Sequence, residues 1–160
     1  MVFKKILVPF DQSDNARDAL DIAVRMAQES PETQLRVVAV VNSSSDPSAK
    51  GADSANLFAG VPAFLMDNEA YRSVIERSLE AETAKLREQV EGAIEPVSSR
   101  CEVQAIFSIN IAEAIVSESR ESGCDLIVMG SRGLGTLRGA LGSVSYSVLH
   151  GADVPVMTVK

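Results

Sequence analysis

Aromatic and basic residues are scarce in this sequence. Aromatic residues make up 4% of the 160-residue chain and tryptophan is absent, so the sequence offers few of the ring platforms on which unpaired bases stack. The 15 basic residues are outnumbered by 22 acidic ones, which leaves a net charge of −7. Broad contact with nucleic acid or an anionic membrane requires a basic face, and we therefore expect neither partner.

Cysteines are also few, and no long hydrophobic run opens the chain. The two cysteines, Cys101 and Cys124, stand outside any CxxC or His-rich pattern, so nothing suggests a metal site. The opening residues MVFKKILVPFDQSD hold an apolar run too short for a signal-peptide core or a membrane span. We therefore expect a cytoplasmic protein in which both thiols are buried rather than joined in a disulfide.

The pattern that is present is that of a single α/β domain over residues 1–160. Hydrophobic residues make up 46% of the chain, enough for a core of two or three layers. Short apolar runs alternate with stretches of helical period, which is typical of βαβ units and a parallel sheet covered by helices on both faces. The pattern predicts strands at 5–10, 35–41, 102–107, 126–129 and 156–159, and helices at 15–29, 68–93, 110–121 and 143–151.

Local signals mark the ends of several elements. Ser13 or Asp14 is expected to cap the first helix, and Asn110 with Glu113 three residues later has the spacing of a capping box. Residues 42–63 form a connection about twice the ordinary length and consist mostly of small or polar residues. We expect this insertion to be mobile.

Candidate binding residues follow from the place where parallel strands end. Ligands of such sheets bind at the carboxyl ends of the strands, near the point where the strand order reverses. The end of the first strand brings Pro9 and Asp11 to this place, the second strand brings Val40, and the fourth leads from Met129 into a glycine-rich segment. We expect these strand ends to meet at one site.

The glycine-rich segment suits a phosphate group. Residues 126–152 contain no carboxylate, and their two arginines are Arg132 and Arg138. Arg132 would add charge to the site, whereas we expect Arg138 to be exposed. Gly130 and Gly133 would let the backbone approach a ligand closely, so a side chain at either position is expected to displace the ligand and spare the fold.

The start of the last helix offers further donors. Gly142 and Ser143 open this helix, and the first N–H groups of a helix favour an anion. Ser143 and Ser145 would add hydroxyl donors. An alternative stays open at this point: the glycines serve turns alone, and Ser143 simply caps its helix.

Other familiar motifs do not match. A P-loop needs a Gly-Lys pair and a dinucleotide fold needs glycines after its first strand, and the sequence has neither. The sole histidine, His150, has no matching nucleophile elbow and is interpreted as a favourable cation at a helix end. Asp11 has two open interpretations, as a helix cap or as a contact to a base, a ribose or a metal-bound phosphate.

Two stretches carry a resemblance to a known family. KKILVPFDQSDNARDAL near the start and GSRGLGTLRGALGSVSYSVLHGADVPVMTVK at the end resemble the universal stress proteins. The resemblance implies an open, Rossmann-like five-stranded parallel sheet in the order 3-2-1-4-5. The nucleotide-binding branch has a G-x2-G-x9-G-[ST] motif that holds ATP phosphates and ribose. Gly130, Gly133, Gly142 and Ser143 match its fixed positions, but the second spacer has eight residues instead of nine.

The resemblance also implies roles for individual residues. Asp11 and the backbone of Val40 would lie near the adenosine, and Met129 beside the base. The ribose and phosphates would be held by the two halves of the motif, namely Gly130, Arg132 and Gly133 on one side and Gly142, Ser143, Val144 and Ser145 on the other.

The resulting hypothesis is a cytoplasmic stress-response protein that binds ATP as a regulatory ligand, with Mg²⁺ accompanying the phosphates. Two alternatives remain: a stress protein that acts through an unknown protein partner without nucleotide, and a slow ATPase, for which the sequence supplies no evident general base. The implied strand order places residues 155–159 at a sheet edge, which must be covered. We expect a homodimer through this strand, unless Pro155 protects the edge by itself.

Overall fold

The computed structural model describes residues 2–41, 68–133 and 141–160. Helices and strands alternate along the chain after the first strand, as the sequence pattern predicts. The elements are β1 (Lys5–Pro9), α1 (Asp14–Glu29), β2 (Gln34–Val41), α2 (Asn68–Ile94), the 3₁₀ helix η3 (Glu95–Arg100), β3 (Cys101–Phe107), α3 (Ile111–Glu121), β4 (Leu126–Gly130), α4 (Ser143–Gly151) and β5 (Val156–Val159).

The five strands form one parallel sheet in the order β3-β2-β1-β4-β5. The order expected from the family resemblance is therefore confirmed. The chain moves outward from β1 to β3 on one side, then crosses back to β4 and β5 on the other. The strand order thus reverses between β1 and β4, and the carboxyl ends of these two strands lie at that switch point.

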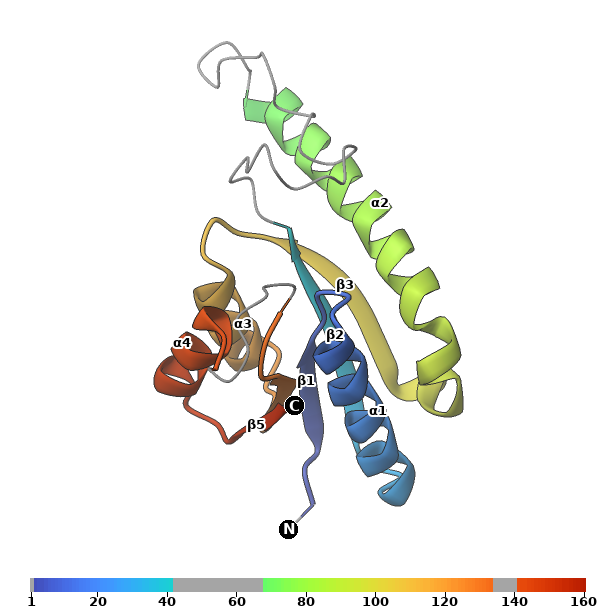
Figure 1. Cartoon of the computed structure of the whole chain (residues 1–160). Coiled ribbons are helices and arrows are strands. Elements are labelled where there is room, and N and C mark those ends of the chain that lie inside the picture. The colour runs from blue at the N-terminus through green and yellow to red at the C-terminus, as the bar shows by residue number, and fades with distance from the viewer. Residues whose placement is uncertain (1, 42–67, 134–140) are drawn as a thin grey trace.

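Helices cover both faces of the sheet, with α1 and α2 on one side and α3 and α4 on the other (Figure 1). Successive strand residues point to opposite faces, so β1 contributes Ile6 and Val8 to the core beneath α1 and α2. Leu7 packs on the other side with Ile115 of α3 and Val148 of α4. All five side chains are buried, and the two cores hold the strand ends at fixed positions.

Edge strand β3 departs from the pattern of a strand covered on both faces. Its Glu102 and Gln104 are exposed, and both hydrogen-bond to Arg36 of β2. Arg36 also forms an ion pair with Glu118 of α3. Polar side chains thus cover the part of this face that α3 leaves open.

Side-chain caps hold two helix starts, as predicted. The Ser13 hydroxyl accepts the Ala16 N–H of α1 at 3.2 Å, so Ser13 rather than Asp14 is the cap. The Asn110 side chain accepts the Glu113 N–H of α3 at 3.2 Å. Helix α4 is different, because its cap residue is Gly142 and no side chain caps it.

Two expectations from the sequence concern residues outside the described ranges. The predicted mobile insertion at 42–63 and Arg138 both belong to the ranges left out. Within the described ranges, no helix has the length and apolar character needed to span a bilayer. Cys101 and Cys124 are free thiols; Cys124 is buried and Cys101 half-buried.

Candidate functional site

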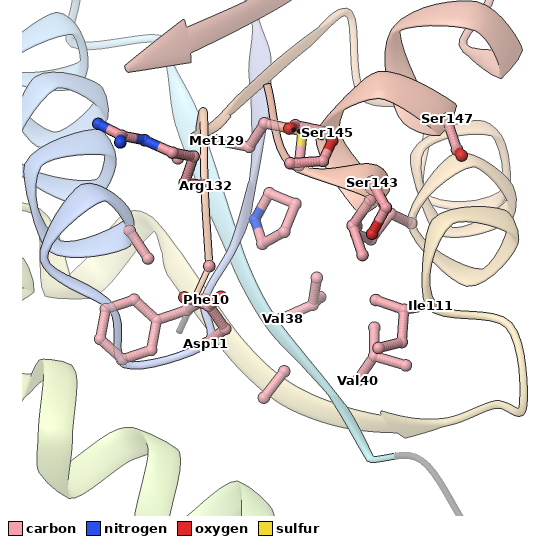
Figure 2. A pocket seen from close by; sticks show the side chains of 18 of the residues that line it. Phe10, Asp11, Val38, Val40, Ile111, Met129, Arg132, Ser143, Ser145 and Ser147 are labelled. Atoms are coloured by element: carbon pink, nitrogen blue, oxygen red, sulfur yellow. Dashed lines mark hydrogen bonds between the residues drawn. The ribbon is translucent and has the colours of Figure 1, made fainter. Parts of the chain in front are cut away.

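A cavity of about 1000 Å³ lies at the carboxyl ends of β1, β2 and β4, against the start of α4 (Figure 2). The structure brings together at its wall every site residue proposed from the sequence: Pro9, Asp11, Val40, Met129, Gly130, Arg132, Gly133, Gly142, Ser143, Val144 and Ser145. Their shared location agrees with the rule for open parallel sheets. What each of them does toward a ligand stays a prediction.

One side of the cavity is apolar. Val38 and Val40 of β2 and Met129 of β4 line it together with Ile111 and Ile115 of α3, and Figure 2 shows Ile111 beside Val40. The two isoleucines were missed in the sequence, although their spacing of four residues places them on one face of a helix. This side offers the flat apolar contacts that a purine ring would use.

The start of α4 forms a polar side of the cavity. Ser143, Val144 and Ser145 line the cavity, and the first backbone hydrogen bond of the helix runs from the Tyr146 N–H to the Gly142 carbonyl. Because the first N–H groups of a helix have no partner within it, they need a cap, water or a ligand. The structure corrects one alternative: Ser143 is the first helical residue, not the cap.

The Ser131 carbonyl ties the two ends of the glycine-rich loop together. It accepts the Gly142 N–H at 2.8 Å and the Ser145 hydroxyl at 2.8 Å. These hydrogen bonds hold Gly142 beside Ser131. The Ser145 hydroxyl is buried and donates to a main-chain carbonyl, so its hydrogen holds the loop rather than pointing at a ligand.

Gly130 is required by the fold. A Cβ at this position would lie 2.9 Å from the Asn15 carbonyl carbon and Cβ, and 3.0 Å from the Ala16 nitrogen. The expectation that a side chain here spares the fold is therefore wrong, because the end of β4 packs directly against the first turn of α1. The Asn15 amide also donates to the Ser131 hydroxyl at 3.0 Å, which fixes the loop from the same helix.

Asp11 organises the turn between β1 and α1. Its Oδ1 accepts the Ser13 N–H at 3.1 Å and the Ser13 hydroxyl at 2.5 Å, so Asp11 orients the cap without being the cap. Its Oδ2 lies 2.5 Å from the place where a Cβ on Gly133 would stand. Gly133 thus leaves room for the Asp11 carboxylate, a role that the sequence did not reveal.

Three charged side chains line the described part of the cavity: Asp11, Glu82 and Arg132. Glu82 of α2 was not anticipated, and it pairs with Lys85 at 3.0 Å. In Figure 2 the Arg132 guanidinium extends toward α1, away from Ser143. Among the residues that the structure describes, no group of three or more acidic, histidine or cysteine side chains could hold a metal ion.

Comparison with known proteins identifies relatives of the whole chain. A model of the universal stress protein family matches residues 2–160. Universal stress protein MJ0577 of Methanocaldococcus jannaschii is 28% identical over 162 residues, which cover 100% of this chain and 96% of the relative. Universal stress protein YxiE of Bacillus subtilis is also 28% identical over 162 residues, covering 99% of this chain and all of the relative.

Solved structures share the fold. Universal stress protein UspA from Lactobacillus plantarum superposes with a TM-score of 0.69 at 22% identity, covering 100% of this chain and 99% of that one. A universal stress protein solved in complex with cAMP has a TM-score of 0.62 at 24% identity, with coverage of 100% and 99%. These likenesses show a common fold.

Proposed function

The chain belongs to the universal stress protein family, and on this basis we propose that it binds ATP as a regulatory ligand in the cavity. The observation that carries the proposal is the uncapped start of α4. Side chains cap α1 and α3, whereas the cap position of α4 is Gly142, which has no side chain to cap the helix, and the first residues of α4 line the cavity. An anionic ligand would satisfy first-turn N–H groups that have no side-chain cap within the described residues.

The two halves of the cavity suit the two halves of a nucleotide. The phosphates would lie against residues 142–144 and the loop at 130–133, which contain no acidic residue of their own, with the Asp11 carboxylate as the neighbouring negative charge beside Gly133. The base would lie against the apolar side formed by Val38, Val40 and Ile111, beside Met129. That a related fold was solved with cAMP makes an adenine nucleotide a reasonable class for this chain as well.

Mg²⁺ would arrive with the phosphates. Mg²⁺ keeps several waters and is commonly bound through one or two carboxylates and substrate phosphates rather than an all-protein cage. Asp11, which lies in the cavity wall, would be the carboxylate available for this role. The ion would supply charge neutralisation to the triphosphate.

The protein is proposed to act in the cytoplasm as a homodimer joined through β5. The free thiols of Cys101 and Cys124 agree with a reducing compartment. Strand β5 lies at the sheet edge, where a second copy could pair with it. A nucleotide-dependent change of protein partner would be the regulatory output.

Ser143→Pro tests the anion site with little risk to the fold. Proline is favoured at the first helical position and has no N–H, and Gly142, at φ −65° and ψ 154°, has the extended conformation that precedes proline. We expect ATP affinity to fall about tenfold, the effect of losing one hydrogen bond to a charged group. Isothermal calorimetry with Mg²⁺ measures this loss, and thermal unfolding verifies the fold.

Ser143→Ala is the matched control, because it removes the hydroxyl and keeps the N–H. A similar loss in both variants would assign the effect to the hydroxyl instead of the helix N–H. Wild-type affinity in Ser143→Pro would show that the start of α4 does not hold the phosphates. Release of inorganic phosphate from ATP that depends on the protein, measured over a long incubation, would instead favour the slow ATPase.

A further inference from the structure

The turn between β1 and α1 contains a residue in an unfavourable backbone conformation. Gln12 has φ 67°, and it is the one residue besides glycine with positive φ within the described ranges. Side chains with a Cβ are disfavoured in this left-handed region, whereas glycine adopts it freely. The Asp11 carboxylate bridges this turn by accepting the Ser13 N–H and hydroxyl.

No contact within the described protein compensates for a glutamine here. The Gln12 side chain is exposed, and no hydrogen bond from its amide is found among the described residues, although Asp11, Ser13 and Asn15 around it all form side-chain hydrogen bonds. A glycine would form the same turn without strain. Strained residues of this kind occur preferentially at ligand sites, and Gln12 lines the cavity next to Asp11.

We propose that Gln12 is a specificity-determining residue whose amide contacts the nucleoside half of the bound nucleotide. This inference rests on the proposed function. A glutamine amide offers both an acceptor and a donor, which matches a ligand edge that carries both, such as the amino edge of adenine or the ribose hydroxyls. Phosphate oxygens only accept, and the start of α4 already provides donors for them.

Gln12→Gly separates the backbone from the side chain. The variant keeps the turn and relieves the strain, so we expect its melting temperature to rise by about 2–4 °C. The same variant should bind Mg-ATP about 3- to 10-fold more weakly, because one hydrogen-bonding amide is lost. Stability and affinity therefore change in opposite directions, which a purely structural role of Gln12 would not produce.

Two ligand analogues identify which part of the nucleoside the Gln12 amide contacts. dATP lacks the ribose 2′-hydroxyl, and ITP lacks the exocyclic amine of adenine. Wild-type protein should prefer ATP to one of the two severalfold, and Gln12→Gly should bring that same ratio close to one. Gln12→Ala is the matched control, since it removes the amide and keeps the strained Cβ: it should lose affinity like Gln12→Gly without gaining thermal stability.

The inference and the proposed function fail in different ways. If wild-type protein binds ATP, and Gln12→Gly binds ATP, dATP and ITP with unchanged affinities, then Gln12 makes no ligand contact and the inference is overturned. If wild-type protein binds none of the three nucleotides, the proposed function is overturned and the inference falls with it. In that second case the rise in melting temperature of Gln12→Gly would still be observed.

Discussion

At the scale of single residues, the space beside Gly130 is too small to hold one added methyl group. We expect Gly130→Ala to lower the free energy of unfolding by about 1–3 kcal/mol, the usual cost of forcing a group into a packed site. The added Cβ would lie 2.9 Å from main-chain and Cβ atoms of Asn15, and main-chain atoms cannot rotate away. Urea unfolding measures the change.

Gly92→Ala is the matched control for that substitution. Gly92 lies inside α2 with nothing within 4 Å of the added Cβ, so alanine should stabilise the protein by about 0.5–1 kcal/mol through helix propensity. Gly133→Ala should cost less than Gly130→Ala, because its neighbour is the Asp11 carboxylate, a side-chain end that can move. Equal effects at Gly130 and Gly92 would contradict the packing account.

The thiol of Cys101 is expected to be unreactive in the folded protein. Burial is the main cause that raises the pKa of Cys101 from 9.0 to about 11, so its thiolate at pH 8 is about 100-fold scarcer than that of an ordinary cysteine. Iodoacetamide should therefore modify the native protein about 100-fold more slowly at Cys101 than the urea-unfolded chain. Equal rates in both states would contradict this result.

The same shift affects stability at alkaline pH. Because the unfolded thiol ionises first, the folded state loses stability as the pH rises through 9 toward 11 and keeps it below 9. Burial raises the pKa of Cys124 as well, so both cysteines act in the same direction. A free energy of unfolding that increases between pH 9 and 10 would contradict the predicted loss of stability.

At the scale of elements, α2 completes the open edge of β3. The hydroxyl of Thr83 in α2 accepts the Ala105 N–H of β3 at 2.9 Å. Thr83→Val keeps the shape and leaves this N–H without its partner, so we expect a loss of about 1–2 kcal/mol in the free energy of unfolding. Hydrogen exchange at Ala105 should accelerate in the same variant.

Thr83→Ser supplies the control for this contact. It retains the hydroxyl, so its protection at Ala105 should stay close to that of the wild type. If the Ala105 N–H exchanged as slowly in Thr83→Val as in the wild type, water would replace the hydroxyl at no cost. Helix α2 would then not be required as a hydrogen-bond partner for the edge of β3.

Sequence periodicity predicted the elements because buried strands and amphipathic helices each have a clear apolar spacing. The strand at 35–41 begins one residue earlier in the structure, at Gln34, and the first helix begins one residue earlier, at Asp14. The candidate site was also predictable in outline, since strand ends and glycines mark it. The contacts of Thr83, Ile111 and Ser131 were not, because they depend on which elements become neighbours in space.

Individual roles were harder to predict than positions. Gly130 and Gly133 were expected to make room for a ligand, but the structure shows them making room for α1 and for the Asp11 carboxylate. A glycine in a sequence shows that space is needed and does not show what fills it. Gln12 gave no signal at all, because its unusual feature is a backbone angle.

For the whole molecule, the open edge of β5 determines the proposed assembly. The carbonyls of Pro155 and Val159 accept hydrogen bonds from residues at either end of β4, so the alternate residues Val156 and Thr158 direct their backbone groups outward. Thr158→Pro removes one outward N–H and leaves the contacts with β4 in place. We expect this change to shift a dimer toward monomer in light scattering across a concentration series.

Thr158→Val preserves the N–H and should dimerise like the wild type. Val156→Lys is a poorer test, because Val156 packs against the core beneath α3 and α4 and a lysine would disturb the fold. A wild-type mass of 17.0 kDa at every concentration would refute the dimer.

Calorimetric titration of the wild-type protein with ATP and Mg²⁺ tests the central claim most directly. The uncapped start of α4, the glycine-rich loop and the apolar wall together form one site in each chain. The account predicts saturable heat with one nucleotide bound per chain, and a rise in melting temperature as ATP is added. Absence of both heat and thermal shift at millimolar ATP would contradict it and favour a stress protein that acts without nucleotide.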